Sequence, residues 1–271
     1  MGGVNGSRNF ILNCAAWSLI YERLCSEGKK DVLDSVHISP GDIGIAPVTG
    51  AVQNIGFPDE KDFYLPYFTA AKNSGIAICV GDGAPDEKLL LGLDAVKSIG
   101  KKAYFFLKPY PNEILFKRID LVRPYACAIG MDIDAYNIVT MRNQVHLERK
   151  TFREIDEIRK YSGLPLMLKG IFTKEDVSLC REVKPDIVVI SNHGGRVETA
   201  EGSSAQFLEE NISELKKYSA QVWVDGGIRT KKDIKVAKFL GTDKILVGRP
   251  FISALCSGSL CGMEAEIKKF L

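Results

Sequence analysis

Several features that mark whole classes of proteins are scarce or missing in this chain of 271 residues. The seven cysteines form no CxxC pair and no Cys/His cluster with metal-ligand spacing, so we expect reduced thiols and no metal. No apolar run approaches the roughly 18 residues that cross a bilayer. The formal net charge is only +2, which gives no reason to expect nucleic acid or an anionic membrane as a partner. These absences favour a soluble, cytoplasmic protein.

Short apolar runs alternate with longer amphipathic stretches almost throughout the chain. The runs predict strands at 43–47, 76–80, 102–107, 126–130, 165–169, 186–190, 221–224 and 244–247. The stretches predict helices at 61–74, 86–99, 112–122, 151–161, 174–183, 204–218, 231–240 and 253–270. A doubly wound sheet would need a GxGxxG motif after the first strand, where this chain has APVTG. Eight strands separated by helices therefore predict a (β/α)8 TIM barrel.

The chain shows no linker, repeat or low-complexity tract, so we predict one domain over residues 1–271. Residues 1–42 precede the barrel as a short N-terminal extension. They contain a predicted helix at 7–25 and a possible strand around 35–39.

Two glycine-rich segments that each carry an arginine follow the last two predicted strands. They are DGGIR at 225–229 and GRP at 248–250. Glycine lets backbone N–H groups approach an anion closely, and a helix N-terminus adds partial positive charge. The loops after strands seven and eight often form the phosphate site of a barrel. Each loop alone could be only a tight turn, but the two together predict phosphate binding.

His193 lies directly after the sixth predicted strand, in the segment SNHGGR. A histidine in such a loop can exchange protons near neutral pH. Arg196 offers a forked cation for a carboxylate three residues later. The alternative is a histidine that only caps its strand beside a solvated arginine.

Lys169 and two aspartates complete the set of candidate residues. Lys169 ends an apolar strand, where its ammonium can stabilise an anion, form a Schiff base or simply reach solvent. Asp132 and Asp134 follow the fourth predicted strand, and Asp132 is the predicted orienter of His193. Two aspartates in a loop could also be turn residues or a weak metal site.

The order of these motifs resembles the FMN-dependent 2-hydroxy acid oxidase/dehydrogenase family, which includes the glycolate and lactate oxidases. The resemblance extends from about residue 43 to the C-terminus. It is strongest from residue 166 onward, where LMLKGI, TKEDV, VVISNHGGR, VWVDGGIR and ILVGRPF follow one another. The chain resembles a divergent, bacterial-type member. The resemblance implies FMN as cofactor.

The resemblance also implies a role for each matching residue. His193 is the expected base, Arg196 the carboxylate ligand, Asp132 the partner of the histidine, and Lys169 the stabiliser of the reduced flavin. Ser191 is expected at the flavin ring and Asp225 at the ribityl chain. The full set of expected cofactor-binding residues is Pro47, Val48, Thr49, Asp82, Lys169, Ser191, Asp225, Gly226, Gly227, Arg229, Gly248 and Arg249.

The departures from the family pattern lie on the substrate side. The family's N-terminal substrate tyrosine has no counterpart. Residues 81–83 read GDG where oxidases carry a serine and a bulky aromatic residue, and Phe106 and Lys108 replace a glutamine and a tyrosine. Lys108 thereby adds a cation to the expected substrate pocket. Residues 132–150 lack the usual proline- and arginine-rich pattern, and Arg142 is the candidate substitute.

The predicted function is therefore FMN-dependent oxidation of a small 2-hydroxy acid or related α-hydroxy carbonyl compound. In that reaction His193 takes a proton while a hydride equivalent reaches flavin N5. The alternative is an FMN-binding carrier, sensor or scaffold without such turnover. A small-molecule substrate and, from the resemblance, a homo-oligomer such as a tetramer are the expected partners.

Overall fold

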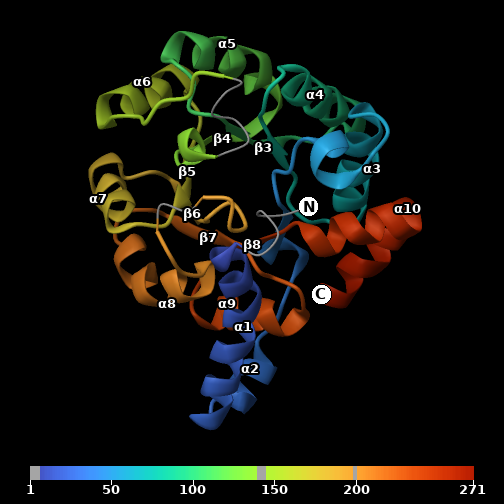
Figure 1. The fold of residues 1–271 in the computed structure, drawn as a ribbon, viewed down its shortest axis with the longest axis vertical. Helices are drawn as coiled ribbons and strands as arrows, with labels where there is room; N and C mark the ends of the chain where they lie inside the picture. The colour runs from blue at the N-terminus through green and yellow to red at the C-terminus, as the bar shows by residue number, and fades with distance from the viewer. Residues whose placement is uncertain (1–6, 139–144, 198–199) are drawn as a thin grey trace.

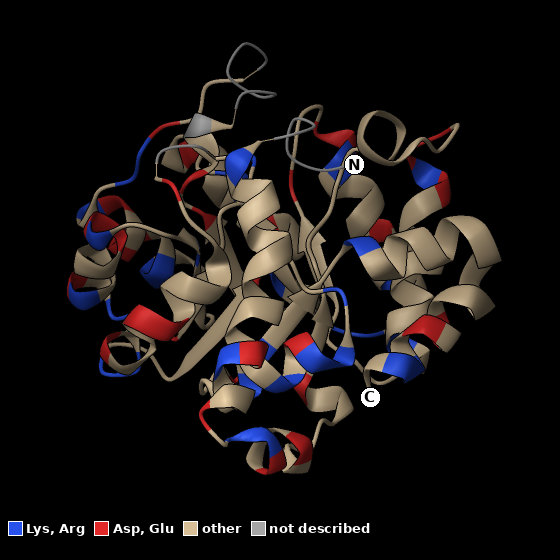
Figure 2. Ribbon diagram, turned by 60° about the horizontal axis from the view of Figure 1, so that its bottom comes forward, with Lys and Arg blue, Asp and Glu red and all other residues tan. Residues whose placement is uncertain are grey.

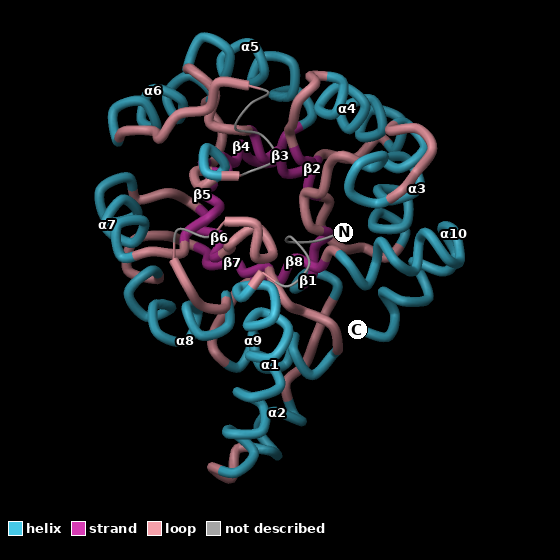
Figure 3. Tube along the Cα trace, viewed as in Figure 1, coloured by secondary structure: helices cyan, strands magenta, loops and turns pink. Residues whose placement is uncertain are grey.

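The computed structural model describes residues 7–138, 145–197 and 200–271. Within them eight parallel strands form a ring that is surrounded by helices (Figures 1 and 3). The strands are β1 (Ile43–Ile45), β2 (Cys79–Gly81), β3 (Ala103–Leu107), β4 (Ala126–Asp132), β5 (Leu166–Ile171), β6 (Ile187–Ile190), β7 (Gln221–Asp225) and β8 (Lys244–Val247). They are hydrogen-bonded in the order β1-β8-β7-β6-β5-β4-β3-β2, and the bridge between Gly44 and Ala77 brings the two ends together. The predicted TIM barrel is confirmed.

Helices follow the strands in alternation, as the amphipathic periodicity predicts. They are α3 (Lys61–Asn73), α4 (Glu87–Ile99), α5 (Asn112–Val122), α6 (Phe152–Ser162), α7 (Lys174–Val183), α8 (Ser204–Leu215), α9 (Lys231–Phe239) and α10 (Arg249–Phe270). Helices α6, α7 and α9 each begin with a capping box, built on Thr151, Thr173 and Thr230. Figure 2 shows Lys and Arg together with Asp and Glu on the outer helices, a mixture typical of solvated faces.

Before β1 the chain forms α1 (Arg8–Ser26) and α2 (Lys30–Ser35), and α1 packs against α8 and α9 (Figure 1). The predicted strand around 35–39 is wrong. Helix α2 occupies its start, and Pro40–Asp42 form a 3₁₀ turn capped by Ser39. The physical reason is local: the Asp42 carboxylate accepts hydrogen bonds from both the backbone and the side chain of Ser39.

Side-chain alternation along the strands explains how the barrel positions a site. A small apolar cluster contains one side chain from most strands, including Phe106, Met167 and Trp223. Because side chains alternate in a strand, the residue two positions later faces the same side. That step leads to Lys108, Lys169 and Asp225 respectively, and these three line the same cavity at the carboxyl ends of the strands. The barrel therefore carries a charged layer directly above an apolar one.

None of the helices in the described ranges has the length and hydropathy needed to cross a membrane.

Candidate active site

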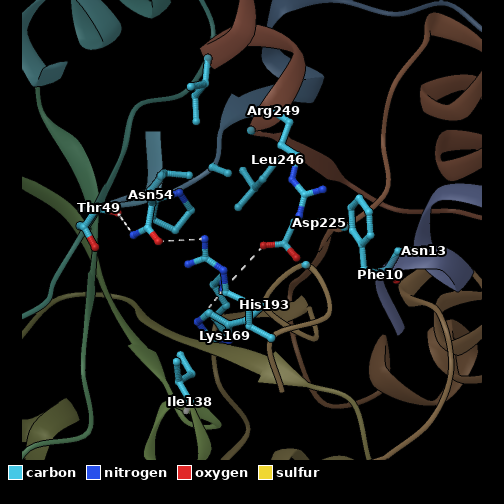
Figure 4. A pocket seen from close by; sticks show the side chains of 18 of the residues that line it. Phe10, Asn13, Thr49, Asn54, Ile138, Lys169, His193, Asp225, Leu246 and Arg249 are labelled. Carbon is cyan, nitrogen blue, oxygen red and sulfur yellow. Dashed lines mark hydrogen bonds and ion pairs between the residues drawn. The ribbon is translucent and has the colours of Figure 1, made fainter. Parts of the chain in front are cut away.

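A cavity of about 510 Å³ lies at the carboxyl ends of the strands, lined by the loops that follow them and by Phe10 and Asn13 of α1 (Figure 4). Its size falls in the range of about 300–1,000 Å³ that is usual for small-molecule sites. The predicted residues that line it are Pro47, Val48, Thr49, Lys108, Lys169, His193, Arg196, Asp225, Gly226, Gly227, Arg229, Gly248 and Arg249. Residues from these separate sequence motifs thus line one cavity.

Three other predicted residues, Asp82, Asp132 and Ser191, are buried and do not line this cavity. Ser191 accepts a hydrogen bond from the backbone N–H of His193, at 3.1 Å. Ser191 therefore fixes the start of the loop that carries the histidine. Arg142 lies outside the described residues.

The expectation that Asp82 binds the cofactor needs correction. Its two carboxylate oxygens are already used: Oδ1 accepts from Arg118 Nη1 at 2.8 Å and from the Gly83 N–H at 2.7 Å, and Oδ2 accepts from the Lys108 N–H at 3.1 Å. The side chain is 1% exposed. Burial raises the pKa of Asp82 to about 6, although the nearby Arg118 cation opposes that rise. The buried Asp82 carboxylate thus holds Arg118 and the backbone at Gly83 and Lys108, directly after β2 and β3.

His193 lies between two carboxylates, and the closer one is Asp134. The Nδ1 atom is 2.6 Å from Asp134 Oδ2, whereas Nε2 is 3.4 Å from Asp132 Oδ2. The short contact assigns the proton of a neutral ring to Nδ1, because a carboxylate accepts but does not donate. Nε2 then carries the lone pair, and the Lys169 ammonium lies 3.4 Å from it. Asp134 thus makes the shorter contact with His193, and Asp132, the predicted orienter, makes the longer one.

Glycine at position 170 explains why Asp134 reaches the histidine. Gly170 has a φ of +95°, and a Cβ built there would lie 2.1 Å from Asp134 Oδ1. Any larger residue would displace that carboxylate. Asp132 meanwhile is the last residue of β4, not a loop residue, and its side chain points to two lysines. Gly170 directly after Lys169 was the sequence signal that could have identified Asp134.

Asp132, Lys108 and Lys169 form a buried cluster, each at most 7% exposed. Asp132 Oδ2 lies 2.5 Å from Lys108 Nζ, and Oδ1 lies 3.2 Å from Lys169 Nζ. Burial alone would raise the pKa of Asp132, but the two ammonium groups hold it well below its usual range. Burial likewise opposes the charge of Lys169, yet Asp132 and Asp225 raise the pKa of that ammonium group. Asp132 and Lys169 are therefore both charged at neutral pH.

Arg196 contacts the turn that follows β1, where its Nη2 donates to Asn54 Oδ1 at 3.3 Å. Asn54 belongs to a π-helical turn (Ala51–Ile55) after β1, and its amide donates to the Thr49 carbonyl at 2.8 Å (Figure 4). The Glu60 carboxylate holds the same turn by accepting from the Gly50 N–H at 2.8 Å. Sequence reasoning missed Asn54 and Glu60, since neither lies in a recognisable motif.

The two glycine loops bring Arg229 and Arg249 to the wall of the cavity. Gly227 has a φ of +80°, and a Cβ there would lie 1.8 Å from the Asn13 carbonyl oxygen, so only glycine fits. The Arg249 guanidinium lies 4.1 Å from the ring centre of Phe10. Burial lowers the pKa of Arg249 to about 10, and the neighbouring Arg229 and Arg196 cations add to the effect. Such crowding of cations favours an anion at this end.

One carboxylate oxygen of the cavity, Asp225 Oδ1, is buried and has no hydrogen-bond partner among the residues described. Asp225 Oδ2 lies 3.6 Å from Lys169 Nζ (Figure 4). A buried acceptor without a donor is costly, so a hydroxyl or N–H donor is expected to fill this position when a ligand binds. Within the described ranges, no group of three His, Cys, Asp or Glu side chains could hold a metal ion.

Comparison with solved structures shows the same fold in mandelate oxidase. The structure with benzoyl-formic acid has a TM-score of 0.70 at 21% identity, and the match covers 99% of this chain and 84% of that one. The structure with 3,3-difluoro-2-hydroxy-3-phenylpropionic acid gives a TM-score of 0.66, also at 21% identity, with the same coverage.

Curated relatives match a shorter part of the chain. L-lactate dehydrogenase (cytochrome) from Saccharomyces cerevisiae is 34% identical over 122 residues, which are 44% of this chain and 21% of that protein. 2-Hydroxyacid oxidase 2 from Rattus norvegicus is 36% identical over 120 residues, 44% of this chain and 33% of the relative. 4-Hydroxymandelate oxidase from Amycolatopsis orientalis is 34% identical over 114 residues, which are 42% of this chain and 32% of that protein. The matched segment thus spans a third or less of these relatives.

A family model described as FMN-dependent dehydrogenase matches residues 115–270, which include β4 to β8 and most of the cavity's charged residues. The match covers more than half of the chain, and the chain therefore belongs to the FMN-dependent dehydrogenase family.

Proposed function

We propose that this protein is an FMN-dependent oxidoreductase that oxidises a small 2-hydroxy acid, or a related α-hydroxy carbonyl compound, to the 2-oxo product. Family membership supports the cofactor and the reaction class. The observation that carries the proposal is the contact of 2.6 Å between His193 Nδ1 and Asp134, in a cavity that also holds Arg196 and Lys169. That contact supports Nε2 as the basic nitrogen of the ring, which the substrate hydroxyl would approach in place of the Lys169 ammonium 3.4 Å away.

The residues of the cavity fit FMN at several points. Arg229 and Arg249, with the glycine loops, would hold a phosphate group, and the pKa of Arg249, lowered by burial and the nearby cations, supports an anion there. Asp225 Oδ1, the buried acceptor without a partner, would accept from a ribityl hydroxyl. The Lys169 ammonium would face the flavin ring as a fixed positive charge. FMN, when bound, would supply the acceptor for the two electrons that leave the substrate carbon.

The chain's own residues would perform the proton chemistry. His193 Nε2 would take the proton of the substrate hydroxyl, and the Asp134 carboxylate would stabilise the resulting imidazolium through Nδ1–H. Arg196 would bind the substrate carboxylate, and Asn54 would hold its guanidinium in position. Loss of the hydroxyl proton and of two electrons with the α-hydrogen converts the 2-hydroxy acid to the 2-oxo acid.

We further propose that the chain folds as one domain, works in the cytoplasm and forms a homo-oligomer. The seven cysteines are all free in the structure, which supports a reducing compartment. Asn13 and Trp17 of α1 bind the loops after β6 and β7, which supports folding as one unit. Light scattering of the purified protein would measure the assembly, and a monomer at micromolar concentration would contradict the oligomer.

The test of the function is the visible absorbance spectrum of the purified protein before and after anaerobic addition of 2-hydroxy acids. We expect a yellow protein whose flavin bleaches with at least one acid of the panel. A yellow protein that no acid bleaches would favour an FMN carrier, sensor or scaffold. A protein that does not bind added FMN would contradict both functions.

A further inference from the structure

The cavity has far more positive than negative charge on its walls. Among its described lining residues the cations are Lys88, Lys108, Lys169, Arg196, Arg229 and Arg249. The single carboxylate among them is Asp225. Lys108 and Lys169 are buried and Lys88 is half-buried. Together the cations give the cavity a positive potential, which favours ligands that carry negative charge.

Most of these cations already have an assigned anion. Lys108 and Lys169 meet Asp132 at 2.5 and 3.2 Å, and Lys169 also approaches Asp225. The two arginines of the glycine loops match a phosphate, and Arg196 matches one substrate carboxylate. Lys88 remains: it lines the cavity and has no ion pair within the described parts of the chain. A substrate with a single carboxylate would leave this charge without a partner.

Lys88 lies in the first turn of α4, and the glycine at position 83 gives it access to the cavity. A Cβ at Gly83 would lie 3.1 Å from Lys88 Cδ and 3.3 Å from Thr49 Oγ1, so a larger side chain would crowd the lysine. Thr49 is in turn linked to Arg196, because Asn54 donates to the Thr49 carbonyl and accepts from the Arg196 guanidinium. Lys88 and Thr49 therefore both lie beside Gly83, and Asn54 joins Thr49 to Arg196.

We propose that Lys88 binds a second anionic group of the substrate, and that the substrate is a 2-hydroxy acid with a second carboxylate. The inference depends on the proposed function for the identity of the first carboxylate. Arg196 takes the carboxylate next to the reacting carbon, and Lys88 takes the distal one through a charge-assisted hydrogen bond. Lys108 stays on Asp132 and adds positive potential to the same region.

Anaerobic flavin reduction in the FMN-loaded protein tests the proposal with matched substrates. We compare 2-hydroxybutanedioate and 2-hydroxypentanedioate with 2-hydroxybutanoate and 2-hydroxypentanoate. Because Lys88 would add a charge-assisted hydrogen bond to the distal carboxylate, we expect kcat/KM to be roughly tenfold or more higher for a dicarboxylate than for its monocarboxylate partner. Equal values, or a preference for the monocarboxylates, would overturn the proposal while leaving the proposed function intact.

The variant Lys88→Met should bring the ratio of kcat/KM between dicarboxylate and monocarboxylate close to one, because it keeps an apolar side chain and deletes the charge. The matched control is Lys97→Met, on the same helix, where the ammonium is exposed and pairs with Asp94. The control should keep the wild-type ratio. A Lys88→Met protein with the wild-type ratio, or one that instead loses FMN, would overturn the proposal.

Binding of unreactive analogues separates this inference from the proposed function. 2-Hydroxy-2-methylbutanedioate and 2-hydroxy-2-methylbutanoate have no α-hydrogen, so they report binding without oxidation. Calorimetry should show roughly tenfold tighter binding of the dianion to the wild-type protein and a smaller difference for Lys88→Met. If no 2-hydroxy acid reduces the flavin, this preference would still support the second anion site, and equal affinities would reject it.

Discussion

Asp132 and Asp134 are two residues apart, yet the structure gives them different partners. Asp134 contacts His193 at 2.6 Å, and Asp132 contacts Lys108 and Lys169. The motifs identified the histidine, the arginines and the lysine of β5, since each lies at a strand end with glycine neighbours. They did not reveal which carboxylate faces the histidine, because Lys108, a residue specific to this chain's pattern, draws Asp132 away.

Asp134→Asn tests the orienting role of Asp134. We expect the rate of anaerobic flavin reduction to fall about 10²-fold, because the amide cannot stabilise the charge that develops on the His193 ring. FMN binding should persist, since Asp134 does not line the cavity. Asp94→Asn, on the exposed side of α4, serves as control. A wild-type rate in Asp134→Asn would show that another group orients the histidine.

The buried carboxylate of Asp132 predicts how stability depends on pH. The two lysines hold its pKa in the folded protein below the value of about 3.9 in an unfolded chain. The folded state therefore gives up this proton more readily. The resulting stabilisation is complete above about pH 5 and is lost progressively as pH falls from about 4 toward the lower pKa of the folded state. Urea unfolding from pH 7 to pH 3 should show this loss for the wild type and less of it for Asp132→Asn. The same pH dependence of the unfolding free energy in both proteins would contradict the low pKa of Asp132.

At the scale of elements, helix α1 holds the loops that form the site. Asn13 Nδ2 donates to Asn192 Oδ1 at 2.7 Å, and its Oδ1 accepts from the Ser204 N–H at 2.9 Å. Trp17 Nε1 donates to the Gly226 carbonyl at 2.8 Å. One helix thus connects the loop of His193 with the first glycine loop. Periodicity predicted this helix but could not predict its docking, which depends on side chains separated by about 180–210 positions.

Asn13→Ala should destabilise the protein by about 1–3 kcal/mol, because it leaves buried polar groups of Asn192 and Ser204 without a partner. It should also weaken FMN binding, since Asn13 borders the cavity. Leu19→Ala on the exposed face of the same helix is the control, with an expected change of about 0.5 kcal/mol or less. Denaturant unfolding and FMN titration measure both effects, and unchanged affinity in Asn13→Ala would contradict the connecting role of α1.

For the whole molecule, strand and helix alternation was enough to predict the barrel. Small errors in strand ends did not matter: β2 begins at Cys79 where residue 76 was expected, and the count of eight is unaffected. The short segments before β1 were harder, since six residues of α2 are too few for periodicity to identify. Long, regular patterns were therefore predictable, whereas short helices and side-chain pairing required the structure.

Cofactor binding should stabilise the whole barrel, because FMN would contact the loops of β1, β5, β7 and β8 together. At a ligand concentration of 100 times Kd, binding to the folded state adds about 2.7 kcal/mol. Thermal unfolding should therefore shift upward with added FMN. Arg249→Met should weaken FMN binding and reduce this shift, since it removes one of the two phosphate cations. If FMN raises the unfolding temperature of Arg249→Met as much as that of the wild type, the phosphate does not bind at Arg249.

The role of His193 as the base in an FMN-dependent oxidation can be measured by the rate of anaerobic flavin reduction. His193→Gln can still hydrogen-bond to Asp134 but cannot take a proton. We expect the variant to bind FMN normally and, with a reactive 2-hydroxy acid, to reduce it about 10²–10⁴-fold more slowly than the wild type. Flavin reduction at the wild-type rate in His193→Gln would show that His193 is not the base.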